Sequence, residues 1–145
     1  MKKMVCYVDG SYKPSYPNKV GSAIVIVKEN DKTEEIFFSK EDKELAQMRN
    51  VSGELRASMW AIKIAVDRKY DVVEIHYDYE GIEKWCTSEW KTKNKYTKLY
   101  KDYYEKMSKL IKIEFVKCDA HSGDYYNDLA DYFAKKSLEI DVTND

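Results

Sequence analysis

Residues 53–78, GELRASMWAIKIAVDRKYDVVEIHYD, decide the fold because the spacing of their apolar side chains changes partway along. From Gly53 onward, apolar residues recur at the three- to four-residue spacing of one helix face, namely Leu55, Met59, Ile62 and Val66. Residues 72–77, VVEIHY, have the composition of a strand, which ends at Asp78. We therefore predict a long amphipathic helix that leads into a strand.

Strand-like segments also precede this helix, and short turns join them: residues 4–9 (MVCYVD), 21–29 (GSAIVIVKE) and 33–40 (TEEIFFSK). Their close spacing predicts an antiparallel meander. Beyond Asp78 we predict two helices, a fifth strand and a last helix, at residues 79–86, about 95–109, 112–117 and about 124–138. Because no repeat or linker interrupts the chain, we expect one domain over residues 1–138 and a frayed tail over residues 139–145.

The element order βββαβααβα predicts an α/β fold with a mixed five-stranded sheet and helices on both of its faces. The first and fourth strands should pair in parallel, since a helix crosses between them. Their carboxyl ends then lie side by side, at the edge where α/β sheets bind ligands. Each of these two strands ends in an aspartate, Asp9 and Asp78.

The overall composition argues for an ordinary globular domain with no strong charge. The chain has 145 residues and a formal net charge of −1, so a nucleic-acid partner would have to be met by a local basic patch. The three cysteines form no CxxC pair, which favours a reducing compartment. No segment approaches a membrane span, and the first residues lack the apolar stretch of a signal peptide. We expect a cytoplasmic protein.

Acidic residues converge on the predicted sheet edge. Glu54 opens the helix that crosses between the strands ending in Asp9 and Asp78, and the last helix begins at the same edge within HSGDYYNDLAD, residues 121–131. Carboxylates brought together repel one another unless a cation neutralises them. Oxygen ligands favour Mg²⁺ or Mn²⁺, and two such ions can hold a phosphodiester for hydrolysis.

Each acidic residue also has a simpler interpretation when taken alone. Asp9 could be a turn residue, Glu54 a first-turn glutamate favoured by the helix dipole, and Asp78 a helix N-cap. His121 alone could be an ordinary loop histidine. Their convergence at one edge makes a metal site the better interpretation.

Four segments of the chain, in order, resemble the signature segments of the type 1 ribonuclease H family: YVDGSY, RNVSGELRA, HYDYEGIEKW and VKCDAHSGDYYNDLAD. The resemblance covers residues 4 to about 138. It implies an endonuclease that cuts the RNA strand of RNA–DNA hybrids with two Mg²⁺ ions and leaves 3′-hydroxyl and 5′-phosphate ends. It further implies four metal ligands, Asp9, Glu54, Asp78 and Asp131, and a role for His121 in proton transfer or product departure.

The last helix offers three aspartates. Asp124 stands where the helix begins and is predicted to be its N-cap. Asp128 and Asp131 both lie off the expected buried stripe of Tyr126, Leu129, Ala130 and Phe133, so helical periodicity does not choose between them. The family pattern places its carboxylate four residues after an asparagine, here Asn127, which favours Asp131 as the ligand.

The resemblance also implies a substrate-binding surface. Gly10, Ser11 and Glu54 map to groups that recognise 2′-hydroxyls, and Asn50 and Asn127 map to further contacts. The segment KWCTSEWKTKNKYTKLYK offers lysines for phosphates, foremost Lys84, Lys91 and Lys93, among the aromatic residues Trp85, Trp90, Tyr96 and Tyr100. The alternative is an exposed amphipathic helix whose Tyr96, Leu99 and Tyr103 face the core.

We therefore expect a monomeric metal-dependent endoribonuclease whose partner is an RNA–DNA hybrid duplex, with no membrane or protein partner evident. Two alternatives stay open at this point. One is a nuclease of the same fold that acts on DNA, and the other is a non-catalytic hybrid-binding module.

Overall fold

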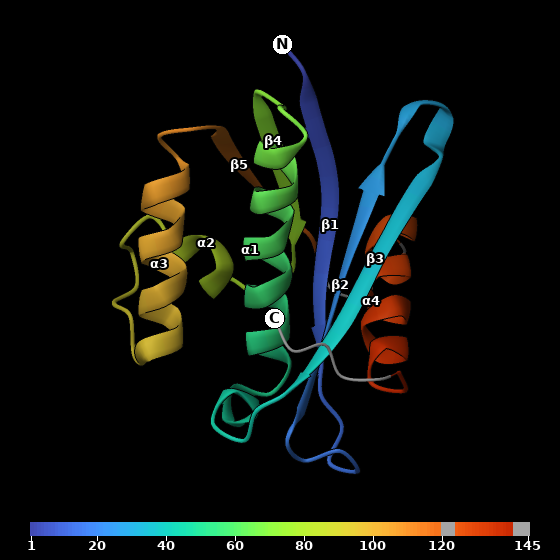
Figure 1. The fold of residues 1–145 in the computed structure, drawn as a ribbon, viewed down its shortest axis with the longest axis vertical. Helices are drawn as coiled ribbons and strands as arrows, with labels where there is room; N and C mark the ends of the chain where they lie inside the picture. The colour runs from blue at the N-terminus through green and yellow to red at the C-terminus, as the bar shows by residue number, and fades with distance from the viewer. Residues whose placement is uncertain (120–123, 141–145) are drawn as a thin grey trace.

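The computed structural model describes residues 1–119 and 124–140. Five strands form one sheet in the order β3-β2-β1-β4-β5 (Figure 1). Their bounds are β1 Lys3–Ser11, β2 Lys19–Val27, β3 Thr33–Glu41, β4 Val72–Tyr77 and β5 Lys112–Lys117. All five predicted strands are therefore present.

The pairing of the strands is mixed, as predicted. β1 and β3 each run antiparallel to β2, which makes the meander. β4 runs parallel to β1, with His76 opposite Tyr7, and β5 runs parallel to β4. The parallel pair places the carboxyl ends of β1 and β4 next to each other.

Four α-helices complete the fold: α1 Asn50–Asp67, α2 Gly81–Lys84, α3 Lys95–Met107 and α4 Tyr125–Ser137. Figure 1 shows α1 and α3 together on one side of the sheet and α4 against β1, β2 and β3 on the other. Two 3₁₀ helices, η1 Glu29–Asp31 and η2 Leu45–Met48, were not expected from the sequence. No described helix has the length and apolar character needed to cross a membrane.

The two faces of β1 supply two cores. Met4, Cys6 and Val8 join a large apolar cluster with α1 and α3, whereas Tyr7 packs with Ala130 of α4 in a smaller one. Because successive strand residues point to opposite faces, this alternation requires helices on both sides of the sheet. The predicted α/β class with helices on both faces is confirmed.

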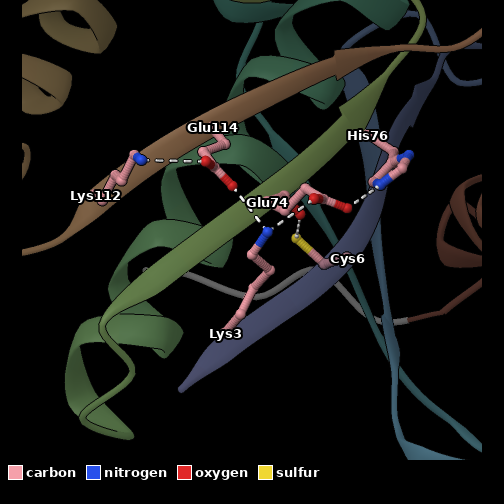
Figure 2. Close-up of polar contacts among 6 residues, drawn as sticks. All are labelled: Lys3, Cys6, Glu74, His76, Lys112 and Glu114. Atoms are coloured by element: carbon pink, nitrogen blue, oxygen red, sulfur yellow. Dashed lines mark hydrogen bonds and ion pairs between the residues drawn. The ribbon is translucent and has the colours of Figure 1, made fainter. Parts of the chain in front are cut away.

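The face of the sheet that α4 covers also carries a polar network, in the part that α4 leaves uncovered (Figure 2). Lys3 on β1 lies 3.3 Å from Glu74 on β4 and 3.1 Å from Glu114 on β5. His76 and Lys112 extend the network, at 2.7 Å from Glu74 and 3.4 Å from Glu114. The alternation of buried Val73 and Ile75 with these polar residues is what a half-covered strand requires.

Two helix faces differ from the prediction. On α3 the buried residues are Thr97, Tyr100 and Met107, whereas Leu99, expected in the core, is 57% exposed. On α4 the predicted stripe is confirmed in part, because Ala130 is buried and Tyr126 and Leu129 pack against its cluster. The other buried residues, Asn127, Ala134 and Ser137, were not predicted. The helices themselves begin and end close to the predicted residues, although α1 starts at Asn50, three residues before Gly53.

Candidate metal centre

Three carboxylates meet at the sheet edge formed by β1 and β4. Asp9 lies near the end of β1, Asp78 directly follows β4, and Glu54 belongs to the first turns of α1. Each offers an oxygen, and these three oxygens all lie within 4.8 Å of one another. The convergence predicted from topology is therefore present for these three residues.

Glycine residues bring the start of α1 onto the sheet. A Cβ atom on Gly10 would lie 2.3 Å from the backbone nitrogen of Glu54, and one on Gly53 would lie 2.1 Å from the carbonyl oxygen of Gly21. The backbone of α1 therefore rests directly on β1 and β2. The hydroxyl of Ser22 also donates a hydrogen bond of 2.7 Å to the carbonyl of Gly53. Contact between β1 and α1 therefore explains why residue 10 is glycine, without requiring that a ligand approach its backbone.

Backbone N–H groups orient two of the carboxylates. Asp9 Oδ1 accepts a hydrogen bond of 2.9 Å from the N–H of Gly10. Glu54 Oε2 accepts hydrogen bonds from the N–H groups of Asp78 at 3.0 Å and Tyr79 at 3.3 Å. The residue at the N-cap position of α2 is Glu80, so the N-cap interpretation of Asp78 does not hold.

The carboxylates lie in an environment that opposes their joint ionisation. Asp9 is 6% exposed and Glu54 is 1% exposed. Burial, followed by the charge of Asp78, raises the pKa of Asp9 to about 8. Burial and the charges of Asp78 and Asp9 likewise raise the pKa of Glu54 well above its usual range. Such a cluster fits a divalent cation, and its all-oxygen donor set is the kind that Mg²⁺ or Mn²⁺ prefers.

Asp131 lies beside this cluster on α4. Its charge, and a hydrogen bond that protonated Asp9 donates to it, contribute to the raised pKa of Asp9, so the two carboxyl groups are neighbours. Asp131 is not in the group of described residues whose oxygens lie within 4.8 Å of one another, and it pairs at 2.8 Å with Lys135. Asp128 is exposed on the same helix. The structure therefore separates two aspartates that periodicity could not.

The start of α4 has the predicted cap. Asp124 accepts hydrogen bonds from the N–H groups of Tyr126 at 3.0 Å and Asn127 at 3.2 Å, which confirms it as the N-cap. Asn127 is 4% exposed, and its Oδ1 has no hydrogen-bond partner among the described residues. Because buried polar atoms normally have a partner, this oxygen, one turn before Asp131 on α4, is a candidate for contact with a bound group. His121 lies outside the described residues.

A groove of about 590 Å³ adjoins the site, and it is lined by Gly10, Ser11, Tyr12, Pro14, Arg49, Asn50, Asp131 and Lys135. Three of the predicted substrate-binding residues, Gly10, Ser11 and Asn50, therefore lie together. Sequence reasoning missed the two cations, Arg49 and Lys135. The spacing of Lys135, four residues after Asp131, is a signal that could have identified it.

The lysine-rich segment divides into paired and unpaired residues. Lys84 pairs with Glu80 at 2.9 Å, whereas Lys91 and Lys93 are exposed and have no carboxylate partner among the described residues. The side chains of Trp85 and Tyr100 are at most 1% exposed. They are therefore core residues, and nucleic-acid bases cannot stack on them. The role of these lysines as phosphate contacts stays a prediction.

Comparison with known proteins agrees with this site. Residues 1–139 match the family described as RNase H. Ribonuclease H from two strains of Clostridium botulinum is 24% identical over 148 aligned residues, which cover 96% of this chain and 97% of the relative.

Solved structures show the same fold. RNase H1 from the halophilic archaeon Halobacterium salinarum aligns with a TM-score of 0.76 at 19% identity, over 94% of this chain and 98% of that one. LC11-RNase H1, solved in complex with an RNA/DNA hybrid, aligns with a TM-score of 0.70 at 19% identity, over 93% of this chain and 99% of that one. With its sequence match over residues 1–139, its mixed five-stranded sheet and its carboxylate cluster, this chain belongs to the RNase H family.

Proposed function

We propose that this protein is an endoribonuclease that hydrolyses the RNA strand of RNA–DNA hybrids with two divalent ions and leaves 3′-hydroxyl and 5′-phosphate ends. The observation that carries the proposal is the cluster of buried Asp9 and Glu54 with half-buried Asp78, in a chain that matches the RNase H family. A non-catalytic binding module would gain nothing from holding these carboxylates together, because their repulsion weakens the fold.

The metal ligands in this proposal are Asp9, Glu54, Asp78 and Asp131. Asp9 would be shared by both ions, since the charges of both Asp78 and Asp131 act on it. When bound, two Mg²⁺ ions, or Mn²⁺ in their place, supply activation of the attacking water and neutralisation of charge on the leaving oxygen. The backbone N–H groups of Gly10, Asp78 and Tyr79 hold the carboxylates in position for this.

The substrate would lie along the groove beside the carboxylates. A relative of the same fold has been solved with an RNA/DNA hybrid, which supports a hybrid as the ligand. Gly10, Ser11 and Asn50 line the groove and are proposed to contact the RNA strand. Lys84, Lys91 and Lys93 are proposed to contact phosphates, with Asn127 near the reacting strand and His121 assisting proton transfer or product departure.

The test is cleavage of an end-labelled RNA–DNA hybrid in Mg²⁺, with duplex DNA and duplex RNA as competing substrates. We expect cuts in the RNA strand of the hybrid alone, products with 5′-phosphate ends, and loss of cutting in Asp9→Asn. Asp128→Asn is the matched control, because it makes the same change at an exposed position on α4. Binding of hybrid without cleavage, or preferred cleavage of duplex DNA, would refute the proposal.

A further inference from the structure

Asp131 interacts with charges of both signs. It lines one groove together with Gly10, the residue after Asp9, so it lies next to the carboxylate cluster. Asp131 Oδ2 also lies 2.8 Å from Nζ of Lys135, one helical turn further along α4.

The arrangement distinguishes Asp131 from the buried carboxylates. Asp9 and Glu54 accept hydrogen bonds from backbone N–H groups, which leave the remaining oxygen lone pairs open to a cation. Asp131 already has an ammonium at the distance of a charge-assisted hydrogen bond. A Mg²⁺ ion binds carboxylate oxygen at about 2.1 Å, so an ion at Asp131 would stand within a few ångströms of that ammonium. Two cations so close repel each other strongly.

We propose that Lys135 is an internal counter-ion of Asp131 and competes with the divalent ion for this carboxylate, and thereby sets the affinity of the second ion site. Because it takes Asp131 as a metal ligand, this role rests on the proposed function. Lys135 is a positioning residue, since it acts through Asp131. Asp9, Glu54 and Asp78 would hold the first ion, and Lys135 would have to move away from Asp131 before that carboxylate could hold the second.

The groove gives the displaced side chain somewhere to go. Lys135, Asp131 and Arg49 all line it, and the Lys135 side chain is 54% exposed. Its ammonium can therefore leave Asp131 and stay hydrated, without unfolding any part of α4. A half-exposed pair of this kind is weak enough to be broken by an arriving ion.

The test is a Mn²⁺ titration of the full, substrate-free chain, with free Mn²⁺ followed by electron paramagnetic resonance. We expect one tight and one weaker ion in the wild type, and a weaker site that tightens by roughly threefold to fivefold in Lys135→Met, from the usual strength of an exposed ion pair. Lys136→Met is the matched control, because it removes the same charge from the next residue, whose ammonium lies near Tyr132. Lys135→Arg, which keeps the charge, should bind like the wild type.

The outcomes separate this role from the proposed function. If Lys135→Met changes the weaker site no more than Lys136→Met does, or weakens it, the counter-ion role is wrong. If Asp131→Asn keeps both ion sites at wild-type affinity, Asp131 is not a ligand and the role fails too. Hybrid cleavage by the wild type is measured in parallel, and its absence counts against the proposed function alone.

Discussion

Replacing Asp9 with asparagine should stabilise the metal-free protein while abolishing its activity. Asp9 is 6% exposed, and burial together with Asp78 raises its pKa to about 8. Asparagine has nearly the shape of a protonated aspartate, and its Oδ1 can still accept the N–H of Gly10. The variant therefore removes a group that must either hold a proton or carry a buried charge near other carboxylates.

The magnitude follows from linkage between protonation and folding. The ordinary aspartate value is 3.8, so between that pH and about 8 the folded state binds more protons than the unfolded state. Stability consequently falls as pH rises through this window, and it is greatest below the unfolded value. The slope is about 1.4 kcal/mol per pH unit, which amounts to about 4 kcal/mol at pH 7. A gain of that size raises the Tm of a domain this large by roughly 8–16 °C.

The assay is thermal unfolding in EDTA, followed by circular dichroism from pH 5 to pH 8. The wild type should lose Tm as pH rises, and Asp9→Asn should melt higher at pH 7 and show a flatter curve. Added Mg²⁺ should raise the Tm of the wild type and leave that of the variant almost unchanged. Asp128→Asn should follow the wild type, since its carboxylate is exposed. A variant that melts at or below the wild type at pH 7 without metal would show that the cluster does not strain the fold.

Three further substitutions test the packing, the helix cap and the phosphate contacts proposed above. Gly10→Ala should destabilise the protein by about 2–3 kcal/mol or prevent folding, measured by urea unfolding, because the new Cβ would lie 2.3 Å from the backbone nitrogen of Glu54. Asp124→Ala removes the cap of α4 and should cost about 1 kcal/mol in the same experiment, whereas Asp124→Asn should cost much less. Lys91→Met together with Lys93→Met should weaken hybrid binding and reduce the slope of log K against log salt by roughly 1–2, measured by fluorescence anisotropy; an unchanged slope would remove these lysines from the phosphate contacts.

The topology and the three-carboxylate cluster could be predicted because local patterns determine both. A helical period between two strand patterns forces a crossover, and a crossover makes β1 and β4 parallel neighbours. Asp9 and Asp78 end those strands, so their meeting follows from the topology. Glu54 joins them because α1 must begin at the edge where the meander ends. None of this depends on how individual side chains pack.

The buried helix faces could be predicted only in part, because they depend on which partner each helix meets. On α4 the sequence offers large apolar residues, yet the helix buries Ala134 and Ser137. A Cβ on Gly21 would lie 2.5 Å from the carbonyl of Ala134 and 2.3 Å from Oγ of Ser137, so the helix packs directly against the backbone of β2. Only small residues fit there. On α3, Tyr100 is fully buried and donates to the carbonyl of Ile82 at 2.6 Å, a partner that helical periodicity does not reveal.

Close packing of helix backbone against strand backbone also explains how the folded protein keeps its mutually repelling carboxylates together. Carboxylates with raised pKa values weaken the metal-free fold, and they would move apart if the backbone around them could yield. It cannot yield easily, because Gly10 and Gly53 leave no space between β1 and α1, and Gly21 leaves none between β2 and α4. Asp9, Glu54 and Asp131 are thus attached to elements whose separation is fixed by backbone contact. Repulsion between them then persists until a cation binds, so part of the affinity for that cation comes from relief of strain in the folded chain.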